Sequence, residues 1–130
     1  MIKKATIVGS GLTGPLLGIL LAKKHNIDVR MYERNSDIRK GGTYSGRSIN
    51  LALSHRGIQA LKNINIFDQI EPDLIPLRGR MIHSLNGNVE FQSYSINKNE
   101  YINSVSREKL NATLMNKAEK TGNVRINFNH

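Results

Sequence analysis

The stretch that decides the fold is residues 4–33, KATIVGSGLTGPLLGILLAKKHNIDVRMYE. Residues 4–8 are rich in β-branched side chains and end at a glycine cluster, which is typical of a buried parallel strand. Residues 13–24 carry an apolar series that ends in two lysines, as helix C-termini often do. Pro15 falls in the first turn, where its missing N–H breaks no bond. Because residues 28–32 indicate a second strand, the whole stretch is predicted to form one βαβ unit.

Residues 9–14, GSGLTG, match the pattern G-x-G-x-x-G between this strand and helix. The glycines allow a tight turn, backbone approach to a pyrophosphate and close helix packing, and the helix N-terminus near Thr13 favours phosphates. Glu33 ends the second strand, where a carboxylate accepts hydrogen bonds from a ribose and disfavours a 2′-phosphate. A glycine hexad alone is a common turn, and Glu33 alone is a solvated charge. The combination predicts a site for FAD or NAD rather than NADP, and it does not choose between the first two.

The rest of the chain continues this alternation of strands and helices. A polar loop is expected over residues 34–47. Helices over 54–64 and 106–121 each begin with a serine that is a candidate N-cap. Residues 123–129 alternate apolar and polar side chains, as a half-buried strand does. The order of elements predicts an α/β fold with a Rossmann-like βαβ unit.

A hairpin is expected in the middle of the chain. Residues 77–85 and 89–94 indicate two strands joined across residues 86–88, because Asn-Gly between apolar runs favours a tight turn. A three-residue loop sets Arg80 opposite Tyr94, whereas a two-residue loop points the two side chains to opposite sides. We expect the three-residue loop.

Composition bounds the class of protein. The 130 residues suffice for one domain with a core, and 38% hydrophobic and 22% charged residues fit a folded soluble chain. The absence of cysteine excludes disulfides and thiolate metal sites. The net charge of +9 invites a nucleic-acid role, but the basic residues are scattered and aromatic residues make up only 5%. We therefore expect no nucleic-acid partner; an anionic cofactor or an acidic remainder of the chain accounts better for the charge.

The N-terminus resembles a targeting segment only at first sight. Lys3 and Lys4 precede a mostly apolar stretch, residues 5–22. Four glycines and Pro15 interrupt it, and no cleavage site precedes Lys23. We expect no signal peptide and a cytoplasmic or membrane-peripheral protein. The histidines lack metal-ligand spacing, so no metal site is expected.

Several longer runs carry a resemblance to a known family. The most specific is residues 47–57, RSINLALSHRG, which follows the second predicted strand. Together with the other runs, it is similar to the kynurenine 3-monooxygenase family of class A flavin hydroxylases. Those other runs are RGRMIHSL (78–85), SVSREKLN (104–111), Asn123-Val124 and Phe128-Asn129-His130.

The resemblance implies a mechanism. Tightly bound FAD would be reduced by diffusing NADPH and would react with oxygen to a flavin hydroperoxide, which hydroxylates L-kynurenine to 3-hydroxykynurenine. The protein would supply positioning and a dry pocket. No catalytic acid–base pair is expected, because the flavin performs the oxygen chemistry.

The resemblance also implies which part of a longer protein residues 1–130 would form. Residues 1–130 would be the N-terminal part of the FAD-binding domain, and the hairpin at about 77–94 would begin a β-rich substrate-binding insertion. A later Gly-Asp segment, most of the substrate sheet and the region tied to membrane attachment would lie beyond His130. The isolated chain is therefore expected to be inactive.

By matched position, the resemblance implies two sets of site residues. The substrate carboxylate would be bound by Arg80 and Tyr94, although the chain is one residue longer than usual between Tyr94 and Arg107. A cation such as Arg107 in the first turn of a helix opposes the helix dipole, which a ligand role would explain; otherwise it is a surface arginine. The FAD contacts would be Gly9, Gly11, Thr13, Gly14, Glu33, Arg34, Asn35, Ser36, Ala52 and Arg107.

Two alternatives remain open from the sequence. One is another class A flavoprotein hydroxylase that acts on a different aromatic acid or on a lipid, for which Arg80 would not face a substrate carboxylate. The other is a non-catalytic dinucleotide-binding fragment.

Overall fold

A computed structural model describes residues 3–41, 49–97 and 99–130. Arg47 and Ser48, at the start of the family-specific run, lie outside the described residues, as do residues 42–46 of the predicted polar loop. The helices, 3₁₀ helices (η) and strands are, in chain order, β1 (Lys4–Val8), α1 (Thr13–His25), β2 (Asp28–Glu33), η1 (Ile38–Lys40), β3 (Asn50–Leu53), α2 (His55–Asn63), α3 (Phe67–Ile70), η2 (Glu71–Asp73), β4 (Ile75–Leu77), β5 (Gly79–His83), β6 (Val89–Ser93), β7 (Ile102–Ser106), α4 (Arg107–Glu119) and β8 (Val124–Phe128).

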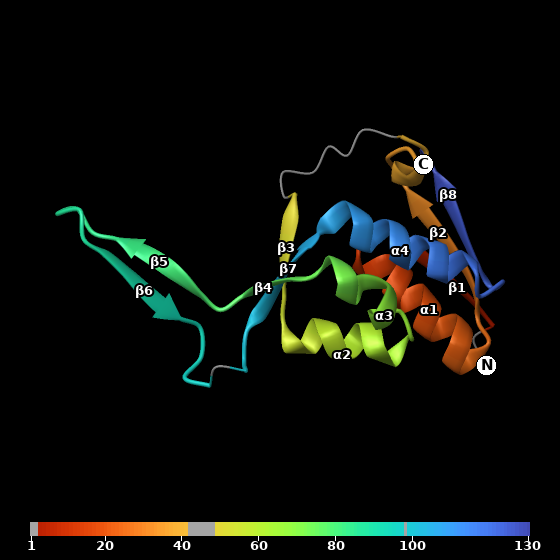
Figure 1. The fold of residues 1–130 in the computed structure, drawn as a ribbon. Helices are drawn as coiled ribbons and strands as arrows, with labels where there is room; N and C mark the ends of the chain where they lie inside the picture. The colour runs from red at the N-terminus through yellow and green to blue at the C-terminus, as the bar shows by residue number, and fades with distance from the viewer. Residues whose placement is uncertain (1–2, 42–48, 98) are drawn as a thin grey trace.

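The predicted βαβ unit is confirmed, since β1 and β2 pair in parallel and α1 connects them. The three-stranded parallel sheet has the order β1-β2-β8, so β2 lies in the middle. Figure 1 shows α1 and α4 side by side against this sheet. The expectation that β1 is a buried strand is wrong for one of its faces. Val8 is 88% exposed, because β1 lies at the edge and the two helices cover one face only.

A second sheet, of order β3-β7-β4, was not foreseen from the sequence. It is antiparallel, and it pairs Asn50 with Ser106 and Leu77 with Ile102. Its strands β3 and β4 are only four and three residues long, too short for a hydrophobic period to stand out. The two predicted helices nearby are confirmed as α2 and α4. Of the two candidate N-caps, the Ser106 side chain accepts from the Lys109 N–H, whereas the Ser54 side chain makes no cap bond.

The predicted hairpin is present as β5–β6, and it projects away from the body of the molecule (Figure 1). Its predicted register is wrong: Arg80 lies opposite Gln92, not Tyr94. The Ser84 N–H donates to the Asn88 carbonyl at 2.9 Å, so the three-residue loop is shifted one position toward the N-terminus. The reason is Gly87, whose φ of +86° fits the last position of such a loop.

The hydrophobic core lies between the parallel sheet, the two long helices and the α2–α3 segment. Its largest fully buried side chains include Ile19, Met31, Ile64, Ile70 and Leu114. These come from distant parts of the sequence, so the parallel sheet and the α2–α3 segment share one core. Of the helices in the described ranges, none has both the length and the apolar character needed to cross a membrane.

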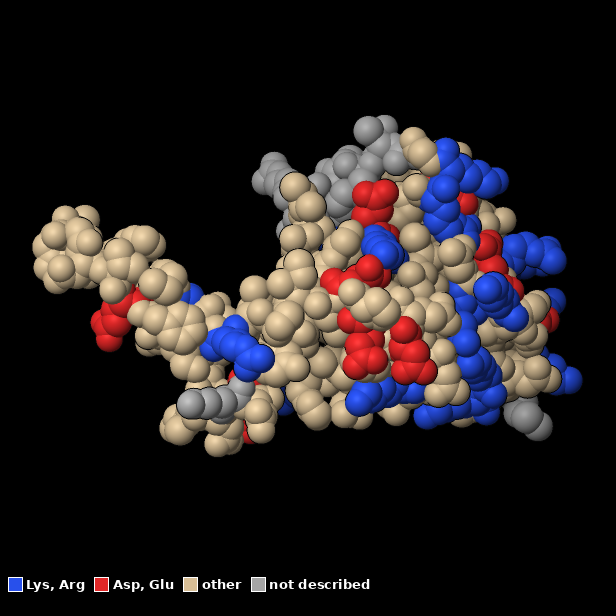
Figure 2. Space-filling model, viewed as in Figure 1, with Lys and Arg blue, Asp and Glu red and all other residues tan. Residues whose placement is uncertain are grey.

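Basic side chains gather where the long helices end. On the face in Figure 2, Lys and Arg lie mainly over the part of the body in which α1 and α4 terminate. Lys23 and Lys24 occupy the last turn of α1, and Lys117 that of α4. Cations there stabilise the helix dipoles, so part of the positive charge has a purely structural use.

Two glycines of α1 give a matched test of helix packing. An added Cβ at Gly14 would lie 2.2 Å from the Gly9 carbonyl oxygen, whereas one at Gly18 would make ordinary contacts at 3.4 Å or more. Gly14→Ala should therefore lower the free energy of unfolding by about 1–3 kcal/mol through overcrowding. Gly18→Ala should be neutral or gain up to about 1 kcal/mol in helix propensity. Thermal or urea unfolding of the full-length variants measures both; equal effects would contradict the packing described.

Candidate functional site

The glycine loop has the geometry that its motif predicts. Gly9 has a φ of +94°, which favours glycine, and its N–H donates to the Tyr32 carbonyl at 2.8 Å. Gly14 allows the first turn of α1 to approach the carbonyl of Gly9. At Gly11, an added Cβ would meet none of the described atoms within 4 Å. Packing inside the chain therefore does not require glycine at position 11, and space is left there for a bound group.

The N-terminus of α1 presents hydrogen-bond donors beside this loop. The helix begins at Thr13, and the first N–H groups of a helix have no acceptor within it. Pro15, in the first turn, has no N–H and leaves no donor unpaired. The loop thus combines space at Gly11, unpaired N–H groups and the positive end of a helix dipole, which suits a diphosphate.

Glu33 lies against the glycine loop, as predicted. Its Oε2 accepts from the Ser10 N–H at 2.7 Å, and its Oε1 accepts from the backbone and side-chain nitrogens of Asn35 at 2.9 and 2.8 Å. Oε2 accepts one hydrogen bond and Oε1 accepts two, so Oε2 can accept a further bond from a hydroxyl group. Burial raises the pKa of the Glu33 carboxyl, but these hydrogen bonds and the charge of Arg34 outweigh it, so the pKa is below its ordinary value.

The three residues after Glu33 form an exposed loop beside it. Its middle residue, Asn35, bonds to Glu33, and the Asn35 carbonyl accepts from the Asn129 N–H at 3.2 Å. The His130 N–H likewise donates to the Glu33 carbonyl at 3.0 Å. The residues after β8 therefore hold this segment, and the structure brings Glu33, with Asn35 bonded to it, next to the glycine loop. No hydrogen bond or ion pair joins Arg34 or Ser36 to the loop within the described residues.

Arg107 and Ala52 belong to the second sheet and the helix that follows it. Arg107 is the first residue of α4; its backbone N–H donates to the Ile49 carbonyl at 3.0 Å. Arg107 is half-buried, and its guanidinium has no hydrogen-bond or ion-pair partner among the described residues. Ala52 lies exposed on β3 opposite Ser104. Within the described residues, no hydrogen bond or ion pair joins either residue directly to the glycine loop.

Sequence reasoning missed Asn111, which connects α4 to the glycine loop. Asn111 is 7% exposed, and its Nδ2 donates to the Ser10 carbonyl at 3.1 Å. It lies one helical turn after Arg107, so both residues occupy the same side of α4. No sequence signal distinguished Asn111 from the solvated polar residues of that helix, because its partner is 101 positions away.

Two buried polar atoms near the loop have no partner in the described part of the chain. They are Ser10 Oγ and Asn111 Oδ1. Buried polar atoms are nearly always hydrogen-bonded to protein, water or ligand. Unused polar capacity at the loop fits a site that is completed by bound water or a cofactor.

Arg80 and Tyr94 share one face of the hairpin, although they are not opposite each other. Arg80 Nε donates to Gln92 Oε1 at 2.7 Å, and the Tyr94 N–H donates to the Arg78 carbonyl at 3.0 Å. Because side chains alternate along strands, Arg78, Arg80, Gln92 and Tyr94 fall on the same face. Tyr94 and Arg80 are then diagonal neighbours, within reach of one small ligand.

A hollow of about 840 Å³ lies beside α2 and the segment that leads from the hairpin into β7. Its lining includes His55, Lys62, Phe67, Tyr94 and Tyr101. Of the predicted site residues, Tyr94 alone is found among its described lining residues. Tyr94 thus borders this hollow, whereas no glycine-loop residue is among its described lining residues.

A family model described as an FAD binding domain matches residues 3–130. The chain therefore belongs to the FAD-binding domain family, and the predicted dinucleotide-binding fold is confirmed. Within this family, the chain is similar to proteins named kynurenine 3-monooxygenase. Kynurenine 3-monooxygenase of Legionella pneumophila (strain Corby) is 46% identical over 127 residues, 98% of this chain and 28% of that protein. That of Sus scrofa is 48% identical over 124 residues, 95% of this chain and 26% of that protein.

These relatives confirm the resemblance drawn from the sequence runs, and the chain spans about a quarter of their length. Comparison with solved structures supports the fold of this chain and nothing more specific. The tetrameric form of 2-methyl-3-hydroxypyridine-5-carboxylic acid oxygenase has a TM-score of 0.77 at 23% identity, over 98% of this chain and 31% of that chain. CmlS, a flavin-dependent halogenase, has a TM-score of 0.73 at 19% identity, over 99% of this chain and 23% of that chain.

The lowered pKa of Glu33 predicts a pH-dependent contribution to stability. A carboxyl group whose pKa is lower in the folded chain contributes stability that is fully present above its unfolded pKa. That contribution is lost as the pH falls through the folded pKa. Glu33→Gln should therefore destabilise the protein at neutral pH and make no difference in sufficiently acid solution.

Urea unfolding of the full-length protein over a range of pH measures the difference between wild type and Glu33→Gln. Glu90→Gln, which removes an exposed carboxylate from β6, is the matched control. A gap between wild type and Glu33→Gln that stays constant at every pH would contradict the hydrogen bonding described for Glu33.

Proposed function

We propose that this chain belongs to a monooxygenase that uses FAD, NADPH and oxygen to hydroxylate L-kynurenine to 3-hydroxykynurenine. The observation that carries the proposal is the contact between the glycine loop and Glu33, which brings a phosphate site and a ribose site side by side. The names of the relatives support the substrate.

The residues present fit FAD. Unpaired N–H groups from Gly11 to Thr13 would hold the pyrophosphate, and Glu33 Oε2 would accept a bond from the adenosine ribose. Arg107, half-buried on α4, offers a positive charge to the same anionic cofactor. Arg34, Asn35, Ser36 and Ala52 would complete the contacts. FAD, when bound, supplies the redox and oxygen chemistry.

NADPH would act here only as a reductant. The Glu33 carboxylate disfavours a 2′-phosphate by charge repulsion, and its lowered pKa keeps it ionised at neutral pH. The glycine loop is therefore unsuited to NADPH, and the match to an FAD binding domain supports FAD as the nucleotide held there. The electrons of NADPH would arrive from a molecule that binds elsewhere and leaves.

The hairpin would recognise the amino-acid part of the substrate. Gln92 accepts from Arg80 Nε, and the two terminal guanidinium nitrogens have no partner in the described part of the chain, so they can bind a carboxylate bidentately. The Tyr94 hydroxyl on the same face can donate to the same group. On this proposal, the β5–β6 hairpin is the start of the substrate-binding region.

The first test uses the full-length enzyme. Kynurenine should accelerate NADPH oxidation under oxygen and yield 3-hydroxykynurenine, which chromatography of the reaction mixture measures. An enzyme that oxidises NADPH at the same rate without kynurenine, but responds to a different aromatic acid, would instead be another class A hydroxylase. Product formation by residues 1–130 alone would contradict the expectation that this segment is inactive.

Arg80→Met should weaken the binding of kynurenine. A charged hydrogen bond contributes about 1.5–3 kcal/mol, so KM for kynurenine should rise about 10- to 100-fold. The turnover number should change less, because the carboxylate lies away from the reacting ring. Steady-state kinetics of the full-length variant measures both constants. Arg125→Met, which removes an exposed arginine from β8, is the control, and an equal effect of the two would contradict the assignment.

A further inference from the structure

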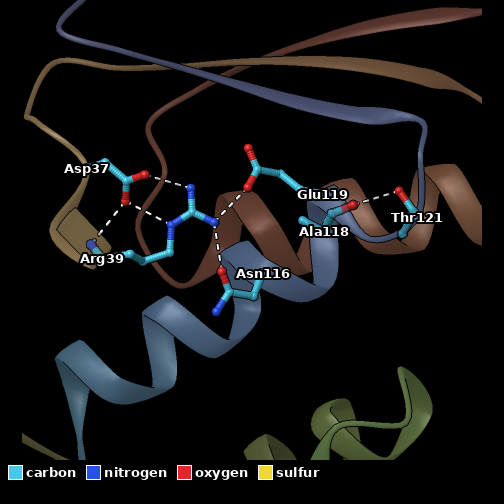
Figure 3. Close-up of polar contacts among 6 residues, drawn as sticks. All are labelled: Asp37, Arg39, Asn116, Ala118, Glu119 and Thr121. Atoms are coloured by element: carbon cyan, nitrogen blue, oxygen red, sulfur yellow. Dashed lines mark hydrogen bonds and ion pairs between the residues drawn. The ribbon is translucent and has the colours of Figure 1, made fainter.

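The Arg39 guanidinium bonds to Asp37 in its own segment and to two residues of α4 (Figure 3). Its Nε and Nη2 donate to the two carboxylate oxygens of Asp37, each at 2.8 Å. Its Nη1 donates to Asn116 Oδ1 at 2.9 Å and to Glu119 Oε2 at 2.6 Å, both on α4. Its Cζ also lies 5.6 Å from the centre of the Phe128 ring on β8. All three guanidinium nitrogens are used, in a geometry that lysine cannot reproduce.

This ion pair is largely shielded from solvent. The Asp37 side chain is 8% exposed and that of Arg39 is 17% exposed. Asp37 also accepts from the Arg39 backbone N–H at 3.0 Å, which caps η1. The hydrogen bond from Arg39 lowers the pKa of Asp37, although burial opposes this. Removal of the guanidinium would leave a nearly buried carboxylate without its counter-charge.

The pair fixes one end of the loop that follows Glu33. At the other end, Glu33 itself bonds to Asn35, and Asn35 bonds to the end of β8. Only residues 34–36 separate Glu33 from Asp37, so the position of Asp37 limits where this loop can lie. With both ends held, the loop beside the proposed ribose site has little freedom.

The same helix also holds the glycine loop. Asn111, in the second turn of α4, donates to the Ser10 carbonyl. Asn116 and Glu119, near the end of α4, accept from Arg39. Helix α4 is thus bonded to the glycine loop at one point and to the segment after Glu33 at another. Because a helix is rigid, α4 fixes the distance between the two halves of the nucleotide site.

We propose that Arg39 is a positioning residue for FAD. By joining η1 to α4, it holds residues 33–36 at the distance from the glycine loop that the ribose and pyrophosphate of one FAD molecule require. In this proposal Arg39 acts through these contacts and not by touching the cofactor, since each of its three guanidinium nitrogens already donates to Asp37 or to α4. The inference rests on the proposed function, since it takes FAD as the ligand.

The test measures the dissociation constant of FAD for the full-length apoenzyme, by the change in flavin fluorescence on binding. If loss of Arg39 leaves about a tenth of the molecules with a competent loop, Arg39→Met should raise this constant about tenfold. The KM for kynurenine at saturating FAD should stay unchanged. Arg39→Lys keeps a charge near Asp37 without the bonds to α4 and should give an intermediate value.

Two further variants keep the test decisive. Glu119→Gln leaves the Asp37–Arg39 pair intact and removes the ion pair to α4, so it should raise the FAD constant by a smaller factor even if Arg39→Met does not fold. Arg30→Met removes an exposed arginine from β2 and is the matched control.

Two results would overturn the proposal. If Arg39→Met, or Glu119→Gln where the former does not fold, binds FAD as tightly as Arg30→Met while its melting temperature falls, Arg39 serves stability alone and the FAD site still stands. If the wild-type apoenzyme takes up no FAD, the proposed function fails together with this inference.

Discussion

The close approach of α1 to the end of β1 is the constraint on which the rest of this structure depends. A Cβ at Gly14 would collide with the Gly9 carbonyl, so the helix can begin where it does only because that residue is glycine. This start directs the helix N-terminus to the carboxyl end of the sheet. The parallel return of β2 then brings Glu33 to the same edge, next to Ser10.

Helix α4 is the second support of the site. Its start follows β7 and carries Arg107, its second turn bonds to the glycine loop through Asn111, and its end accepts from Arg39. Segments far apart in the sequence are therefore held by one rigid element. A binding site for a long dinucleotide needs such a support, because its two ends must keep a constant separation.

The hairpin has two different faces. The register places Arg80, Gln92 and Tyr94 on one face, and Met81 opposite Phe91 on the other. The first face offers charge and hydrogen-bond donors, whereas Met81 and Phe91 are both more than half exposed. Under the proposed function, substrate recognition falls to the polar face. The error in the predicted register does not change this, because Arg80 and Tyr94 still point to the same side of the hairpin.

The sequence by itself determined the βαβ unit, the glycine loop, the Ser106 cap of α4 and the presence of a hairpin, because each depends on residues close together in the chain. Only the tertiary structure decided the sheet of β3, β7 and β4, the pairing of Arg80 with Gln92, and the contacts of Asn111 and Arg39. Strands of three or four residues are too short for their hydrophobic pattern to be recognised in the sequence. In a hairpin, a shift of the loop by one residue changes every cross-strand pair. A polar side chain on a helix reveals its partner only when packing has brought the two together.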